Sequence, residues 1–65
     1  MNININKQQY TFEKEVKLMD ALKLFEVYQP YAILLNDEFI PQSEHEFTWL
    51  KDNDKVDVVG AIQGG

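Results

Sequence analysis

The fold is decided by the stretch KVDVVGAIQGG, residues 55–65, because it joins a strand pattern to a glycine ending. Its first part, Lys55–Val59, is rich in the β-branched valine that strands favour. This strand runs straight into Gln63-Gly64-Gly65. A last strand with such an ending makes the terminal carboxylate, rather than a cleft, the first candidate for chemistry.

A carboxylate on glycine suits reaction inside the active site of another protein. Gly64 and Gly65 lack a Cβ and accept nearly any backbone conformation, so they can thread a channel that larger side chains would block. An ionised α-carboxylate can attack the α-phosphate of a nucleotide held by a separate enzyme and give an acyl adenylate. The alternative is a frayed terminus, since a terminal glycine pair arises by chance in roughly 0.5% of chains.

Composition limits the other functions. The 65 residues predict one domain, 1–65, too small for both a core and a cofactor cavity. Cysteine is absent, which excludes disulfides, thiolate nucleophiles and Cys-ligated metals, so any sulfur that the chain carried would not sit on its own thiol. No apolar run is long enough to span a membrane and no signal-peptide pattern is present, so we expect a cytoplasmic protein without membrane contact.

The charge balance favours a protein partner over nucleic acid. Eleven acidic residues stand against six basic ones, all lysine, and the net charge is −5. Nucleic-acid binding normally requires a basic face, whereas an acidic surface accelerates encounter with a basic protein. The alternative is that the excess acid only keeps a small domain in solution.

The element order predicts a mixed sheet around one helix. Alternation over residues 1–6 indicates a first strand, and Lys7-Gln8 is the predicted turn into a second strand over residues 9–12. The apolar spacing of Leu18, Leu22 and Phe25 predicts one helix from about Leu18 to Tyr28, ended by Pro30. Further strands follow at residues 32–35, 39–40 and 55–59. The expected fold is therefore α+β, a β-grasp (ubiquitin-like) sheet of four to five strands.

Several of these segments together carry a family resemblance. The stretches AILLN (residues 32–36), FIPQSEH (39–45) and LKDNDKVDVVGAIQGG (50–65) resemble the ThiS family, the sulfur carriers of thiamine biosynthesis. Residues 7–30 match only in their apolar pattern. Asn53 stands where the family often has glycine, and Asn is the next most tolerant residue for positive φ. The helix entry, at Val16 or Lys17, lacks the usual threonine cap.

The resemblance implies a protein cosubstrate that is not an enzyme and is monomeric alone. Gly65 would be adenylated by a ThiF-like adenylyltransferase that uses ATP, converted to a thiocarboxylate through a sulfur donor system, and used by a ThiG-like thiazole synthase. Two alternatives stay open: a MoaD-like small subunit of molybdopterin synthase, and a ubiquitin-like modifier or interaction module.

The residues before Gly65 are predicted to bind the partner. If Val56, Val58 and Ile62 face the core, alternation sends Val59 and Ala61 to the opposite face as an exposed apolar patch. One alternate set of the preceding strand, either Tyr31, Ile33 and Leu35 or Ala32 and Leu34, would extend it. The predicted partner-binding residues are Gly64, Gln63, Ile62, Ala61 and Val59, with residues 61–65 as a flexible tail.

The remaining candidates favour structural roles. Asp52, Asp54 and Asp57 do not fit a calcium loop, so no metal site is expected. His45, between Glu44 and Glu46, is predicted to be a surface-loop residue without catalytic or metal-binding function. The aromatic residues are predicted to pack around the helix and the long loop; they are Tyr28, Tyr31, Phe47 and Trp49.

Overall fold

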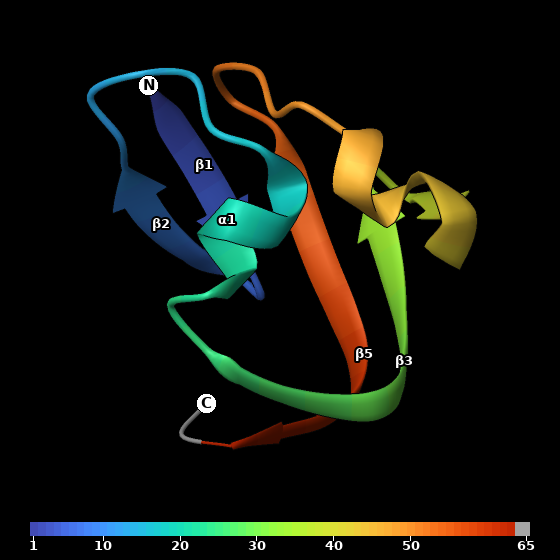
Figure 1. Ribbon diagram of the computed structural model, residues 1–65. Helices are drawn as coiled ribbons and strands as arrows, with labels where there is room; N and C mark the ends of the chain where they lie inside the picture. The colour runs from blue at the N-terminus through green and yellow to red at the C-terminus, as the bar shows by residue number, and fades with distance from the viewer. Residues whose placement is uncertain (64–65) are drawn as a thin grey trace.

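The protein is a mixed five-stranded sheet with one short helix against one face (Figure 1). The computed structural model describes the backbone of residues 1–63 and the side chains of residues 1–25 and 30–60. The elements in chain order are β1 (Asn2–Ile5), β2 (Gln8–Thr11), α1 (Leu18–Leu22), β3 (Glu26–Leu35), β4 (Glu38–Ile40), the 3-10 helix η1 (Gln42–Phe47) and β5 (Lys55–Gln63). The strand order is β2-β1-β5-β3-β4. This is the β-grasp arrangement that the sequence predicts.

The last strand lies between the two hairpins. β5 pairs in parallel with β1, where Ile5 lies opposite Val56, and antiparallel with β3, where Ile33 lies opposite Val58. The two hairpins, β1–β2 and β3–β4, are antiparallel. Segments that are far apart in the sequence, β1 and β5, therefore lie side by side in the sheet.

Each hairpin turn begins with an asparagine in a left-handed conformation. Asn6 and Lys7 have φ values of 50° and 70°, and Asn36 and Asp37 have values of 51° and 69°. Two consecutive positive φ values define the turn that best fits the twist of a hairpin, and asparagine tolerates them better than most residues. The predicted first turn, Lys7-Gln8, is wrong by one residue, because Gln8 already pairs with Ile5 in β2.

One continuous apolar core lies between α1 and the sheet. Its fully buried large side chains, each below 2% exposure, are Ile3, Ile5, Leu18, Ile33, Leu50 and Val56. Val58, Ala21 and Leu22 complete it. Burial of an aliphatic side chain of this size contributes about 1.5–3 kcal/mol, so the hydrophobic effect dominates the stability of the sheet and helix contact.

The helix is much shorter than predicted. α1 ends at Leu22, and backbone i to i+3 bonds from Leu24 to Ala21 and from Phe25 to Leu22 close its last turns. The predicted end at Tyr28 is wrong because β3 begins at Glu26 and Val27 pairs with Ile62. The expected absence of a side-chain cap at Lys17 is confirmed. A helix this short depends on packing rather than on its own hydrogen bonds.

A bulge shapes the long ribbon that β3 and β5 form. The pairing register shifts because Gln29 and Pro30 are two extra residues between the pairs Tyr28–Ala61 and Tyr31–Gly60. Gly60 has φ 146°, and a Cβ built there would lie 2.8 Å from the Pro30 carbonyl oxygen and 3.0 Å from the Tyr31 Cα. The chain requires glycine here for both reasons. Pro30, predicted to end the helix, lies instead inside β3 at this bulge.

The last strand extends further than predicted. β5 runs to Gln63, which pairs with Glu26, whereas the sequence predicts a strand that ends at Val59 and a flexible tail over residues 61–65. Ala61, Ile62 and Gln63 thus belong to a strand by backbone pairing. Gly64 and Gly65 lie outside the described residues, and the mobility of the tail stays a prediction.

We expect Gly60→Ala to destabilise the protein by about 1–3 kcal/mol, because the methyl group meets the Pro30 carbonyl and φ is one that L-residues avoid. Equilibrium urea unfolding followed by circular dichroism measures the change. Val59→Ala is the control at the adjacent exposed position, and its effect should be smaller. An unfolding free energy equal to that of the wild type for Gly60→Ala would contradict the close approach at the bulge.

Candidate interaction site beside the last strand

The outer face of the sheet carries an apolar patch next to the end of β5. Val58 is 7% exposed and Val59 is 57% exposed, so the predicted alternation is confirmed for this pair. Val59 lies opposite Ala32, and Leu34 lies opposite Phe39, which is 61% exposed. These residues define the outer patch: Ala32, Leu34, Phe39 and Val59. Because strand pairs place opposite residues on the same face, the patch spans three neighbouring strands.

The structure decides which alternate set of β3 extends the patch. Ile33 is fully buried and Tyr31 and Leu35 pack against the core, so Ala32 and Leu34 form the outward set. Phe39 was not predicted as part of the patch, although the pairing of β3 with β4 places it there. The side chains of Ala61 and Ile62, predicted to face outward and inward respectively, lie outside the described residues.

The rest of the outer face is polar. On β1 and β2, Asn2 lies opposite Thr11 and Asn4 lies opposite Gln9. Among the described side chains, the apolar part of the outer face therefore lies on β3, β4 and the middle of β5. An apolar area on one side of a small domain commonly marks a protein interface.

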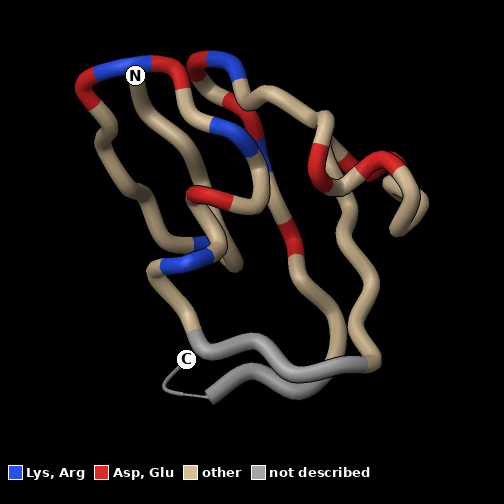
Figure 2. Tube along the Cα trace, viewed as in Figure 1, with Lys and Arg blue, Asp and Glu red and all other residues tan. Residues whose placement is uncertain are grey.

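Acidic residues flank the outer patch. Figure 2 shows acidic residues along η1, which are Glu44 and Glu46, but η1 lies on the core side of the sheet, where His45 stacks on Tyr31. Glu38 and Asp37 are exposed at the β3–β4 turn. The acidic residues beside the patch are Asp57, which lies opposite Leu34, and Asp37, and they suit a partner with basic residues around an apolar centre.

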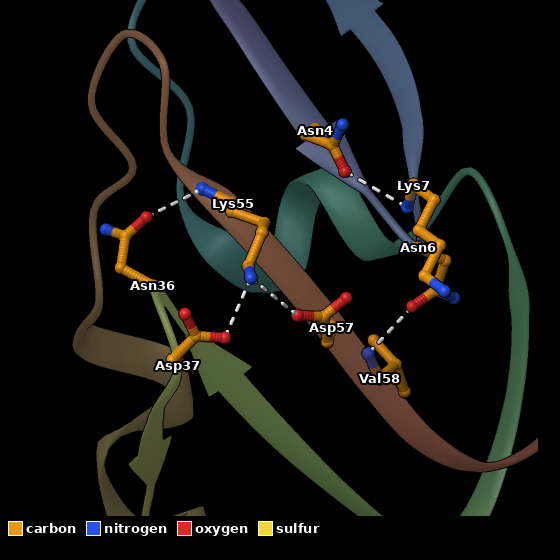
Figure 3. Close-up of polar contacts among 8 residues, drawn as sticks. All are labelled: Asn4, Asn6, Lys7, Asn36, Asp37, Lys55, Asp57 and Val58. Carbon is orange, nitrogen blue, oxygen red and sulfur yellow. Dashed lines mark hydrogen bonds and ion pairs between the residues drawn. The ribbon is translucent and has the colours of Figure 1, made fainter.

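One lysine partly balances this charge. Lys55 Nζ lies 2.7 Å from Asp37 Oδ1 and 3.9 Å from Asp57 Oδ2 (Figure 3). The hydrogen bond to Asp37, together with its charge, raises the pKa of Lys55 above the ordinary value. The stabilisation that protonated Lys55 gives the folded state is fully present below the unfolded-state pKa of lysine. It is lost as pH rises through the higher folded-state pKa. At neutral pH Lys55 is therefore protonated, and its ammonium can pair with Asp37.

His45 is a structural residue rather than a surface one. It is 5% exposed, its Nε2 lies 2.9 Å from the Ile40 carbonyl oxygen, and its ring stacks on Tyr31 with centroids 6.0 Å apart. The predicted surface-loop position is wrong because η1 turns this side chain inward. Its lack of a catalytic or metal role stays a prediction, and no group of three potential metal ligands occurs among the residues that the structure describes.

The aromatic residues divide between core and surface. Tyr31 packs against the core as predicted. Phe47 is 76% exposed and Trp49 is 52% exposed, so the predicted packing is wrong for both. In η1, with about three residues per turn, position 47 shares a side with exposed Glu44, not with His45. Trp49 pairs with Lys17 across an isolated bridge, and Lys17 Nζ lies 5.3 Å from the Trp49 ring centroid. The Tyr28 side chain lies outside the described residues.

The fold places the chain in the β-grasp, ubiquitin-like class. The ThiS family model matches residues 1–65, and the chain therefore belongs to the ThiS family. Among solved structures it is similar to a thiamine biosynthesis protein (ThiS) from Geobacter metallireducens, with a TM-score of 0.77 and 25% sequence identity over 100% of both chains. No curated protein matches the chain.

Family and structural likeness support a sulfur carrier of thiamine biosynthesis, a small protein that is not a catalyst. The family also implies interaction with activating and sulfur-transfer enzymes. In the part of the chain that the structure describes, neither helix has the length and hydrophobicity needed to cross a bilayer.

Proposed function

We propose that the protein carries sulfur as a thiocarboxylate on Gly65. The terminal carboxylate attacks the α-phosphorus of ATP bound by a ThiF-like adenylyltransferase, and pyrophosphate leaves. A hydrosulfide equivalent from a sulfur donor system then adds to the acyl carbon, and AMP leaves. The thiocarboxylate is used by a ThiG-like thiazole synthase. The match of the ThiS family to residues 1–65 carries this proposal.

The chemistry of the chain supports this assignment. The sequence has no cysteine to hold a persulfide, whereas a carboxylate on Gly65 can receive sulfur by acyl activation. We assign Gly65 the reacting carboxylate, and the preceding Gly64, Gln63, Ile62 and Ala61 the contact with the partner channel. Because residues 61–63 pair with β3, the part that enters the recessed nucleotide site in this proposal is Gly64-Gly65, which reaches about 7 Å when extended.

The outer patch supplies the docking surface in this proposal. Val59 lies in the strand that leads to the terminus, so a partner that covers the patch holds the start of the reactive segment. Exposed Phe39 offers the large aromatic contact that interface centres favour. The acidic flank favours a basic rim on the partner. Docking and delivery of the terminus then depend on the same strand.

The MoaD-like and ubiquitin-like alternatives share the fold and the glycine ending but not the family match. Intact mass analysis after incubation with a ThiF-like enzyme, ATP and a sulfur source tests the proposal directly. The expected product has one terminal oxygen replaced by sulfur. Transfer of that sulfur to a molybdopterin precursor, and not to a thiazole, would favour the MoaD-like alternative.

Deletion of Gly65 should abolish thiocarboxylate formation and leave the thermal unfolding midpoint nearly unchanged, because terminal residues outside the core contribute little stability. Mass analysis and calorimetry on the same sample measure both effects. Addition of one residue after Gly65 should have the same result, since it moves the reacting carbonyl. A deletion variant that gains sulfur at the wild-type rate would contradict the assignment of Gly65.

Val59→Asp should weaken binding to the ThiF-like enzyme by about tenfold or more, because it places a charge in the apolar patch. Stability should fall less than affinity, since Val59 is exposed. Calorimetric titration measures the affinity. Gln9→Glu is the matched control, because it adds the same charge to the polar half of the same face. Equal affinities for the two variants would place the docking surface elsewhere.

A further inference from the structure

Two asparagine side chains attach the hairpin turns to β5 (Figure 3). Asn6 donates its backbone N–H to the Val56 carbonyl at 2.9 Å, and its Oδ1 accepts the Val58 N–H at 2.9 Å. Asn36 donates its N–H to the Lys55 carbonyl at 2.7 Å, and its Oδ1 accepts the Lys55 N–H at 2.9 Å. The same residue type therefore clamps the strand from both sides.

The two clamps act at different places along β5. Asn36 holds Lys55, the first residue of the strand. Asn6 holds Val58, immediately before the exposed Val59 and the bulge at Gly60. The Asn6 clamp is therefore the one closer to the reactive terminus.

On the β1 side, Asn6 extends the support of β5 beyond the backbone ladder. The parallel pairing ends where Ile5 meets Val56, because the chain turns at Asn6 and Lys7. The amide oxygen of Asn6 then takes the place of a backbone carbonyl. It accepts the next β5 N–H that points toward β1, which is that of Val58. Within the described residues, this is the last hydrogen bond between the first hairpin and β5. Past it, only β3 pairs with the strand.

We propose that Asn6 is a positioning residue that aims the reactive terminus. This inference rests on the proposed carrier function. With the clamp, β5 leaves the first hairpin at Val58. Without it, support on that side ends at Val56, two residues or about 6.6 Å of strand earlier. Val59 and the segment beyond it then start from a less defined position relative to the docked domain, and a misplacement of only about 1 Å at the reacting atoms can slow the chemical step.

The backbone conformation at position 6 and the distance to β5 explain why an asparagine suits this position. A residue with φ 50° must tolerate the left-handed region, and its side chain must be short enough to reach Val58 from the turn. Aspartate meets both conditions and keeps the accepting oxygen, whereas glycine keeps the conformation and removes the acceptor. The pair Asn6→Gly and Asn6→Asp therefore separates the hydrogen bond from the backbone strain.

The test measures adenylation kinetics with the ThiF-like enzyme and amide exchange by NMR. For Asn6→Gly we expect faster exchange at Val58, a fall in kcat of about tenfold, and KM within about twofold of wild type, because the outer patch is intact. Asn6→Asp should restore kcat. Asn53→Gly is the neutral control, since Asn53 also has a positive φ and its side chain does not bond to β5.

Asn36→Gly is the control for a merely structural role. It removes the other clamp and also the bond from Asn36 Nδ2 to Asp54, so it should lower the unfolding midpoint at least as much as Asn6→Gly and leave kcat unchanged. The inference is overturned if Asn6→Gly keeps the wild-type kcat, if Asn6→Asp does not restore it, or if Asn36→Gly lowers kcat equally. An inactive wild-type protein under the same conditions would instead overturn the proposed carrier function.

Discussion

The pairing of β5 with both hairpins is the interaction on which the rest of the structure depends. Without it, β1–β2 and β3–β4 would be two separate hairpins, and isolated hairpins are marginally stable in water. Val56 and Val58 bring the core contacts of this strand, opposite Ile5 and Ile33. The same strand that closes the fold carries the terminal glycines, so stability and delivery of the terminus share one element.

The sequence predicts the parts of the fold that depend on alternation. Strand positions at Ile3, Ile5, Val56 and Val58 follow from a period of two with one buried face, and the exposure of Val59 follows from the same rule. The turn at Asn53 was also predictable, because φ there is 70° and asparagine tolerates it. These are local preferences that agree with the global fold.

The errors occur where tertiary contacts override local pattern. Phe25 fits a helical spacing, but pairing with β5 draws the chain into a strand at Glu26. The sequence around His45 predicts a polar loop residue, but its imidazole is buried, because it contacts the Ile40 carbonyl and stacks on the Tyr31 ring. The proposed roles of Phe39 and Asn6 depend on which residues of neighbouring strands lie beside them. That pairing relates residues distant in the sequence, so it cannot be predicted from either segment alone.

The extent of β5 changes the energetics of the proposed delivery. Ordering a backbone costs about 1–2 kcal/mol per residue. If residues 61–65 were all ordered on binding, the docking surface would have to offset about 5–10 kcal/mol. Because strand pairing already orders the backbone of residues 61–63, these three residues would add little to that cost. In the proposed delivery, the outer patch therefore has less ordering entropy to offset than a fully unpaired tail would require. In this proposal, the bulge at Gly60 and the Asn6 clamp set the direction in which β5 leaves the first hairpin.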